Sequence, residues 1–179
     1  ARVPPKQFLM NLESGKRKEI FSAPNVDPSR YVWMANSSGF YCSRDEASDS
    51  TDTYVAARAL YHYDVQSDVL RKVNLDWPMF LGGGYSVTKD GLLVALANGV
   101  NNKLAFYRKN GNKWKLSWLK HKREKNIEIL AVGEDRTTVV YQISTASTPP
   151  VIYRGLISDH DILGQTELLS LNPWMKKKN

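Results

Sequence analysis

The sequence predicts an all-β fold, a partial β-propeller of about three four-stranded antiparallel blades preceded by two strands of another blade. Short apolar or aromatic segments alternate with polar turns along the 179 residues. A unit of four such segments recurs every 43–53 residues, which matches the length of one propeller blade, as in WD-type repeats. No segment shows a convincing helical spacing of apolar residues.

The first half of the chain contains a hairpin and then a complete unit. Residues 8–21 read as two strands around a turn at Gly15. Strands at 30–36 and 39–43 begin the next unit, and a hairpin that turns at Asp68 completes it. A blade cannot bury both of its faces alone, so these units are expected to stack on one another.

The second half repeats this arrangement twice. Asp90-Gly91 is a strong hairpin signal between two apolar strands, and the glycine run before them is expected to be a loop that leads into the first. In the last unit a longer loop is expected before a final strand at 167–171. The predicted units span residues 1–21 (partial), 30–74, 83–118 and 127–171, and residues 172–179 are expected to begin a linker.

Ser86 follows the glycine run and therefore resembles a catalytic nucleophile. A nucleophile elbow requires G-x-S-x-G between a strand and a helix, because its turn is strained and crowded. Here Thr88 occupies the position of the second glycine, and a second strand follows instead of a helix. The sequence contains no G-x-S-x-G, so no catalytic residue is expected in this chain.

The net charge of +7 is spread unevenly, with a basic stretch between Lys103 and Lys125. Interleaved with Trp114 and Trp118, this stretch could bind single-stranded nucleic acid through stacking and phosphate contacts. However, Lys113-Trp114-Lys115-Leu116 alternates with period two, the pattern of a half-buried strand. The solvated face of a strand is the favoured interpretation, and nucleic acid is an unlikely partner.

Other chemistry has little support in the sequence. The single cysteine, Cys42, excludes an internal disulfide. Asp159-His160-Asp161 could hold a metal, but three adjacent loop residues rarely form a defined site, so no metal and no cofactor is expected. His62 is expected to pack in a strand and His121 to be solvated. No apolar run reaches the length of a membrane span, and the compartment stays open between cytoplasm and periplasm or secretion.

The last 35 or so residues carry a more specific signal. STASTPPVIYRGLI at 144–157, followed by TELLSLNPWMKKK at 166–178, resembles the last propeller blade of the prolyl oligopeptidase family of serine peptidases. Ser170 stands where threonine is commoner in that family. The resemblance implies a parent protein in which the propeller covers an α/β-hydrolase domain and restricts access to short peptides. The partners implied are that catalytic domain and a peptide substrate.

A stand-alone module that binds an acidic partner or nucleic acid, with self-association of the chain, is the alternative function. The acidic segment Asp45–Asp52 is the best candidate for function within the chain, and it is expected to be a loop. Its first residues, Asp45 and Glu46, are candidates for binding the amino terminus of a peptide substrate. The competing interpretation is a solvated loop without a ligand.

Overall fold

The computed structural model describes residues 6–21, 28–47, 56–110, 113–119, 126–158, 160–172 and 174. The described residues form three four-stranded antiparallel sheets and one two-stranded sheet, so the predicted fold class is confirmed. The strands are β1 (Gln7–Met10), β2 (Arg17–Ile20), β3 (Ser29–Trp33), β4 (Gly39–Ala47), β5 (Ala56–Asp64), β6 (Val69–Lys72), β7 (Leu81–Val87), β8 (Leu92–Asn98), β9 (Asn101–Asn110), β10 (Lys113–Trp118), β11 (Asn126–Val132), β12 (Thr138–Ser144), β13 (Val151–Ile157) and β14 (Ile162–Ser170).

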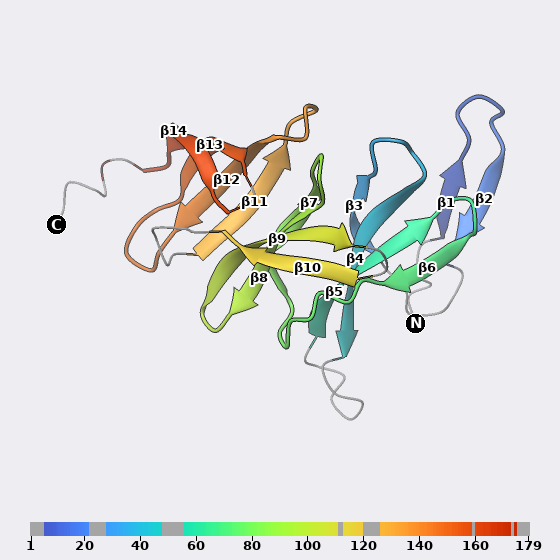
Figure 1. Ribbon diagram of the computed structural model, residues 1–179, viewed down its shortest axis with the longest axis horizontal. Helices are drawn as coiled ribbons and strands as arrows, with labels where there is room; N and C mark the ends of the chain where they lie inside the picture. The colour runs from blue at the N-terminus through green and yellow to red at the C-terminus, as the bar shows by residue number, and fades with distance from the viewer. Residues whose placement is uncertain are drawn as a thin grey trace.

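Each four-stranded sheet is a meander in which consecutive strands pair: β3 to β6, β7 to β10 and β11 to β14. Figure 1 shows the sheets following one another across the molecule in sequence order, from the β1–β2 hairpin at one end to β14 at the other. Hairpin connections explain this order, because short turns join only antiparallel neighbours.

The core lies between the sheets. Strand β8 has the apolar run LLVALA, which is buried on both faces. Leu92, Val94 and Leu96 pack with residues of the β3–β6 sheet, among them Tyr41 and Leu60. The intervening Leu93 and Ala95 pack with the β11–β14 sheet. Since alternate strand residues point to opposite faces, a continuous apolar run is what a strand between two neighbouring sheets requires.

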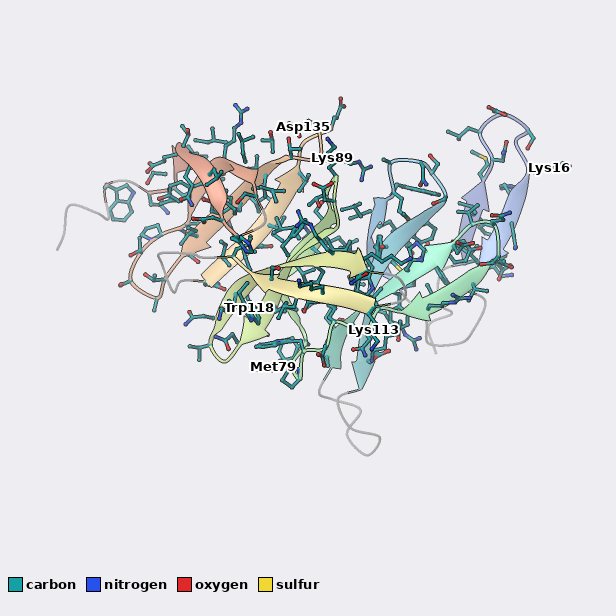
Figure 2. All side chains as sticks on the ribbon, viewed as in Figure 1. Lys16, Met79, Lys89, Lys113, Trp118 and Asp135 are labelled. Atoms are coloured by element: carbon teal, nitrogen blue, oxygen red, sulfur yellow. The ribbon has the colours of Figure 1, made fainter. Side chains whose placement is uncertain are left out.

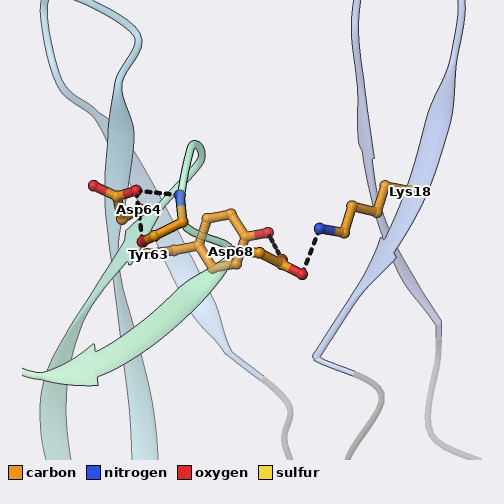
Figure 3. A network of polar contacts seen from close by, with 5 residues as sticks. Lys18, Tyr63, Asp64 and Asp68 are labelled. Carbon is orange, nitrogen blue, oxygen red and sulfur yellow. Dashed lines mark hydrogen bonds and ion pairs between the residues drawn. The ribbon is translucent and has the colours of Figure 1, made fainter.

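The β1–β2 hairpin packs on the β3–β6 sheet in the same manner. Ile20 is buried against Phe40 and Tyr63. Lys18 on β2 forms an ion pair with Asp68 in the β5–β6 turn, and Asp68 also accepts a hydrogen bond from the Tyr63 hydroxyl (Figure 3). The bond from Lys18 and then the bond from Tyr63 lower the pKa of Asp68. A polar link at the surface thus supplements the apolar contact below it.

Three local expectations were wrong. The glycine run is not a loop, because β7 begins at Leu81 and contains Gly82 to Gly84 around a bulge. The acidic segment starts on a strand, since β4 continues to Ala47, and residues 48–52 lie outside the described residues. Strand β14 begins at Ile162, which leaves a short connection instead of the longer loop expected.

Candidate functional site

The glycine run of β7 lies where three sheets meet. A β-carbon added at Gly83 would stand 2.3 Å from the carbonyl oxygen of Ile127 on β11. A β-carbon at Gly84 would stand 2.6 Å from the Arg30 guanidinium, and Gly84 has a φ of +95°. Glycine is therefore required here for close approach and backbone conformation, and the run shapes the contact between sheets.

Arg30 on β3 joins these sheets. Its guanidinium donates a hydrogen bond of 2.8 Å to the carbonyl oxygen of Ile129 on β11 and lies 5.8 Å from the centre of the Tyr85 ring on β7. The Tyr85 hydroxyl in turn donates to the Arg30 carbonyl oxygen. One side chain from β3 thus links the first strands of three consecutive sheets, and this is a structural role.

Ser86 is not placed as a nucleophile. It lies on β7, is buried, and faces Leu93 of β8 across the sheet. Neither of the histidines among the described residues, His62 and His160, forms a hydrogen bond with it. A catalytic serine needs a base within about 3 Å and access for substrate, and Ser86 has neither among these residues.

The two candidate acids lie at the end of β4 and have basic partners. Asp45 forms an exposed ion pair of 3.1 Å with Arg58, its cross-strand neighbour on β5. Glu46 accepts a bond of 2.6 Å from Lys72 and another from the Tyr61 hydroxyl. Exposed pairs of this kind are worth less than about 1 kcal/mol, so a competing cation could displace them.

Glu46 and Lys72 also border a pocket of about 390 Å³ at the connection from β6 to β7. Trp77, Met79 and Phe80 from this connection supply its apolar wall, and Figure 2 shows Met79 at the edge of the molecule. Met79 is 42% exposed and Phe80 is 44% exposed. Glu46 is therefore near a depression of ligand size, whereas Asp45 does not line it.

The part of the basic stretch from Lys113 to Leu116 alternates between exposed and half-buried residues, as expected. Lys113 and Lys115 are exposed on β10, while Trp114 and Leu116 are half-buried. Trp118 packs edge-on against Trp77, with ring centres 5.0 Å apart, and the Lys103 ammonium lies 4.3 Å from its centre (Figure 2 labels Trp118). Trp118 is thus engaged within the protein, and residues 120–125 lie outside the described residues.

A second pocket, of about 560 Å³, is lined by residues of the β3–β6 sheet and of the β7–β10 sheet, and we name it the cationic pocket. Its lining includes the rings of Tyr41, His62 and Trp114. It also includes the positively charged side chains of Arg71, Lys109 and Lys113. Figure 2 places Lys113 where β10 approaches the β3–β6 sheet. The pocket therefore collects residues of β4, β5 and β6 on one side and of β9 and β10 on the other.

The Tyr41 and His62 rings, which both line this pocket, are affected by burial, and His62 also by nearby charges. Their centres are 4.8 Å apart. Burial lowers the pKa of His62, Asp64 opposes the shift, and Lys109 and Arg71 lower it further. Burial raises the pKa of Tyr41 to about 12. Both groups are thus neutral at pH 7, and the positive charge of the pocket comes from its lysines and arginine.

The described residues contain no group of three or more His, Cys, Asp and Glu side chains that could hold a metal ion. Asp159 of the loop motif lies outside them, while the Asp161 carboxylate accepts a bond from the backbone N–H of Ile162. Within the same described ranges, no helix is long and apolar enough to cross a membrane.

Comparison with known proteins provides no relative from which a function could be inferred, so function is inferred from the observations above. No known protein family matches the chain, and no curated protein is similar to it in sequence. The resemblance to the prolyl oligopeptidase family is therefore carried by the residues of the last blade alone.

Sequence reasoning missed the cationic pocket as a site. Lys113 and Trp114 were noted as part of a strand pattern, but Arg71 and His62 belong to another blade. One feature of the sequence could have indicated the pocket. Basic residues occur in the last hairpins of two consecutive repeats, at Arg71-Lys72 and from Lys109 to Lys113.

Proposed function

We propose that this chain is a non-catalytic propeller segment of a serine peptidase of the prolyl oligopeptidase family. Its role is to limit which peptides reach the active site and to dock the α/β-hydrolase domain that performs the cleavage. The observation that carries the proposal is an arc of stacked blades whose two outermost sheets carry exposed apolar side chains on their outer faces.

The outer face of the β1–β2 hairpin is the first of these. Phe8 and Met10 on β1 are 53% and 50% exposed, while Gln7 and Leu9 alternate toward the neighbouring sheet. The outer face of the β11–β14 sheet is the second, where the paired residues Leu156 and Leu163 are 50% and 54% exposed. Exposed apolar groups of this extent at both ends favour further blades as neighbours.

The last sheet contains the segments that resemble the peptidase family. Val151 to Ile157 form β13, and β14 ends at Ser170, just before Leu171-Asn172. Thus the family-like residues occupy the last two strands of a blade, where the resemblance expects them. This agreement in position supports the proposal beyond composition alone.

The surroundings of the serine and the acids considered as functional residues support a gating role. Among the described residues, Ser86 is buried without a histidine partner, and the acids Asp45 and Glu46 are engaged by Arg58 and Lys72. Buried tyrosines and Arg30 join neighbouring sheets, and a gating role requires sheets that hold together in this way. Cleavage is therefore assigned to a separate catalytic domain, with the nucleophile on that domain.

A stand-alone binding module for an anionic partner is the second candidate. The cationic pocket favours it, since Arg71, Lys109 and Lys113 converge there from two sheets. The two functions differ in what they require: gating requires a serine nucleophile in the same polypeptide, and the binding module does not.

Labelling with a fluorophosphonate, which reacts with activated serines, tests the proposal. Native protein is captured with an antibody raised against this chain, treated with the probe, and digested for mass spectrometry. We expect the label on a serine within G-x-S-x-G, in the same polypeptide as residues 56–110. An unlabelled protein, in a preparation where a reference serine hydrolase is labelled, would overturn the peptidase proposal.

A further inference from the structure

The cationic pocket combines two features, positive charge and aromatic rings. The first feature is positive charge from both sheets, with Arg71 on β6, Lys109 on β9 and Lys113 at the start of β10. The other feature is aromatic, because the half-buried Trp114 ring lies 6.4 Å from Tyr41, centre to centre, at 70°. From this combination we infer that the pocket binds a nucleoside phosphate, a small anion that carries a planar ring.

The balance of charge favours a phosphate over a single carboxylate. Lys72 is paired with Glu46, so its charge is largely compensated. Arg71, Lys109 and Lys113 form no ion pair with a carboxylate among the described residues, and Asp76 is the acidic side chain that lines the pocket with them. Three cations facing one carboxylate leave an excess that a doubly charged phosphate neutralises.

Charged side chains of both sheets act on His62 within the pocket. Asp64 favours the protonated form of His62, whereas Lys109 and Arg71, from different sheets, both disfavour it. A bound phosphate would oppose the effect of Lys109 and Arg71 and raise the pKa of His62. The histidine is thus a reporter of occupancy inside the pocket.

Size and lining define the rest of the ligand. A volume of about 560 Å³ suits a mononucleotide, since small-molecule sites typically occupy about 300–1,000 Å³. Trp114 offers an aromatic ring on which a base can stack. Asn74 and Asp76, which also line the pocket, can meet sugar hydroxyls or ring amines.

The inference stands apart from the proposed peptidase function, since a propeller with or without a catalytic domain can contain this pocket. Calorimetric titration of the whole protein with ADP, pyrophosphate and adenosine tests it. We expect ADP to bind, pyrophosphate to bind about tenfold more weakly, and adenosine to bind more weakly still, because both charge and stacking contribute.

Matched variants locate the binding. We expect Lys109→Gln with Lys113→Gln to weaken ADP binding about tenfold or more. The control, Lys16→Gln with Lys89→Gln, removes the same charge at exposed positions that do not line the pocket (both labelled in Figure 2), and we expect less than a twofold change. Arg71→Gln serves as the second pocket variant where the double variant folds poorly. Nuclear magnetic resonance should show ADP raising the pKa of His62.

Several results would overturn the inference. These are the absence of binding at millimolar ADP, equal weakening by the pocket and control variants, or pyrophosphate binding as tightly as ADP. An RNA oligonucleotide that binds when ADP does not would replace the small ligand with a nucleic acid.

Discussion

Gly83 provides the sharpest test of how the sheets pack around β7. An isolated glycine inside a strand normally costs about 0.5–1 kcal/mol relative to alanine, so Gly→Ala at an unconstrained position is expected to stabilise. At Gly83 the new β-carbon would stand 2.3 Å from the Ile127 carbonyl oxygen and 3.1 Å from the Ala95 β-carbon. We therefore expect the opposite sign.

The magnitude follows from the displacement required. Carbon and oxygen atoms in van der Waals contact lie about 3.3–3.6 Å apart, so β7 and β11 must separate by roughly 1 Å. Because the obstructing atom is backbone, the cost should reach the upper part of the overpacking range, about 3 kcal/mol. For a chain of this size that is a drop of about 6–12 °C in melting temperature.

Thermal unfolding followed by circular dichroism, with urea midpoints as a second measure, checks this value. The control is Gly99→Ala, where φ is +64° and no atom lies within 4 Å of the added β-carbon. It should cost only about 1 kcal/mol, through the left-handed backbone. A Gly83→Ala protein within about 0.5 kcal/mol of the parent would refute the packing described for β7 and β11.

Three further substitutions probe single interactions. Arg30→Met should lower stability by about 1 kcal/mol in urea titrations, because the bond to the Ile129 carbonyl oxygen is lost; no loss would refute the linking role. Burial lowers the pKa of His62 in the folded protein, so the unfolded protein binds more protons and the free energy of unfolding falls as the pH drops below 6.5. His62→Gln should make this fall smaller. An unchanged dependence of stability on pH would contradict the lowered pKa of His62. The Asp135 carboxylate accepts bonds from the N–H groups of Thr137 and Thr138, which hold its pKa well below the usual range. Asp135→Ala should lower the melting temperature at pH 7 and make the loss of stability below about pH 4 smaller than in the parent protein. An equal melting temperature at pH 7 would count against the turn's role.

Local pattern was sufficient to predict the blades. Period-two alternation and turn residues such as Asp68 and Asp90-Gly91 depend only on neighbours along the chain, and hydrophobic runs such as LLVALA mark strands covered on both faces. The strands expected around Gly15 and Asp68 are present, and both turn residues have positive φ.

Contacts between blades could not be predicted in the same way. The glycine run was wrongly expected to be a loop. Its glycines are required because Ile127 and Arg30 approach the backbone closely, and both residues are distant in sequence. The cationic pocket likewise joins Arg71 with Lys113 across two sheets. Such sites depend on how repeats stack, and spacing within one repeat contains no information about that contact.

The proposal that this propeller arc belongs to a larger serine peptidase makes a direct prediction about the size of the native protein. The intact mass of the native protein, detected with an antibody against this chain, tests it most directly. A mass several times the 20.3 kDa of these 179 residues is the predicted result. A native protein of 20.3 kDa would contradict the claim, because it leaves no room for a catalytic domain.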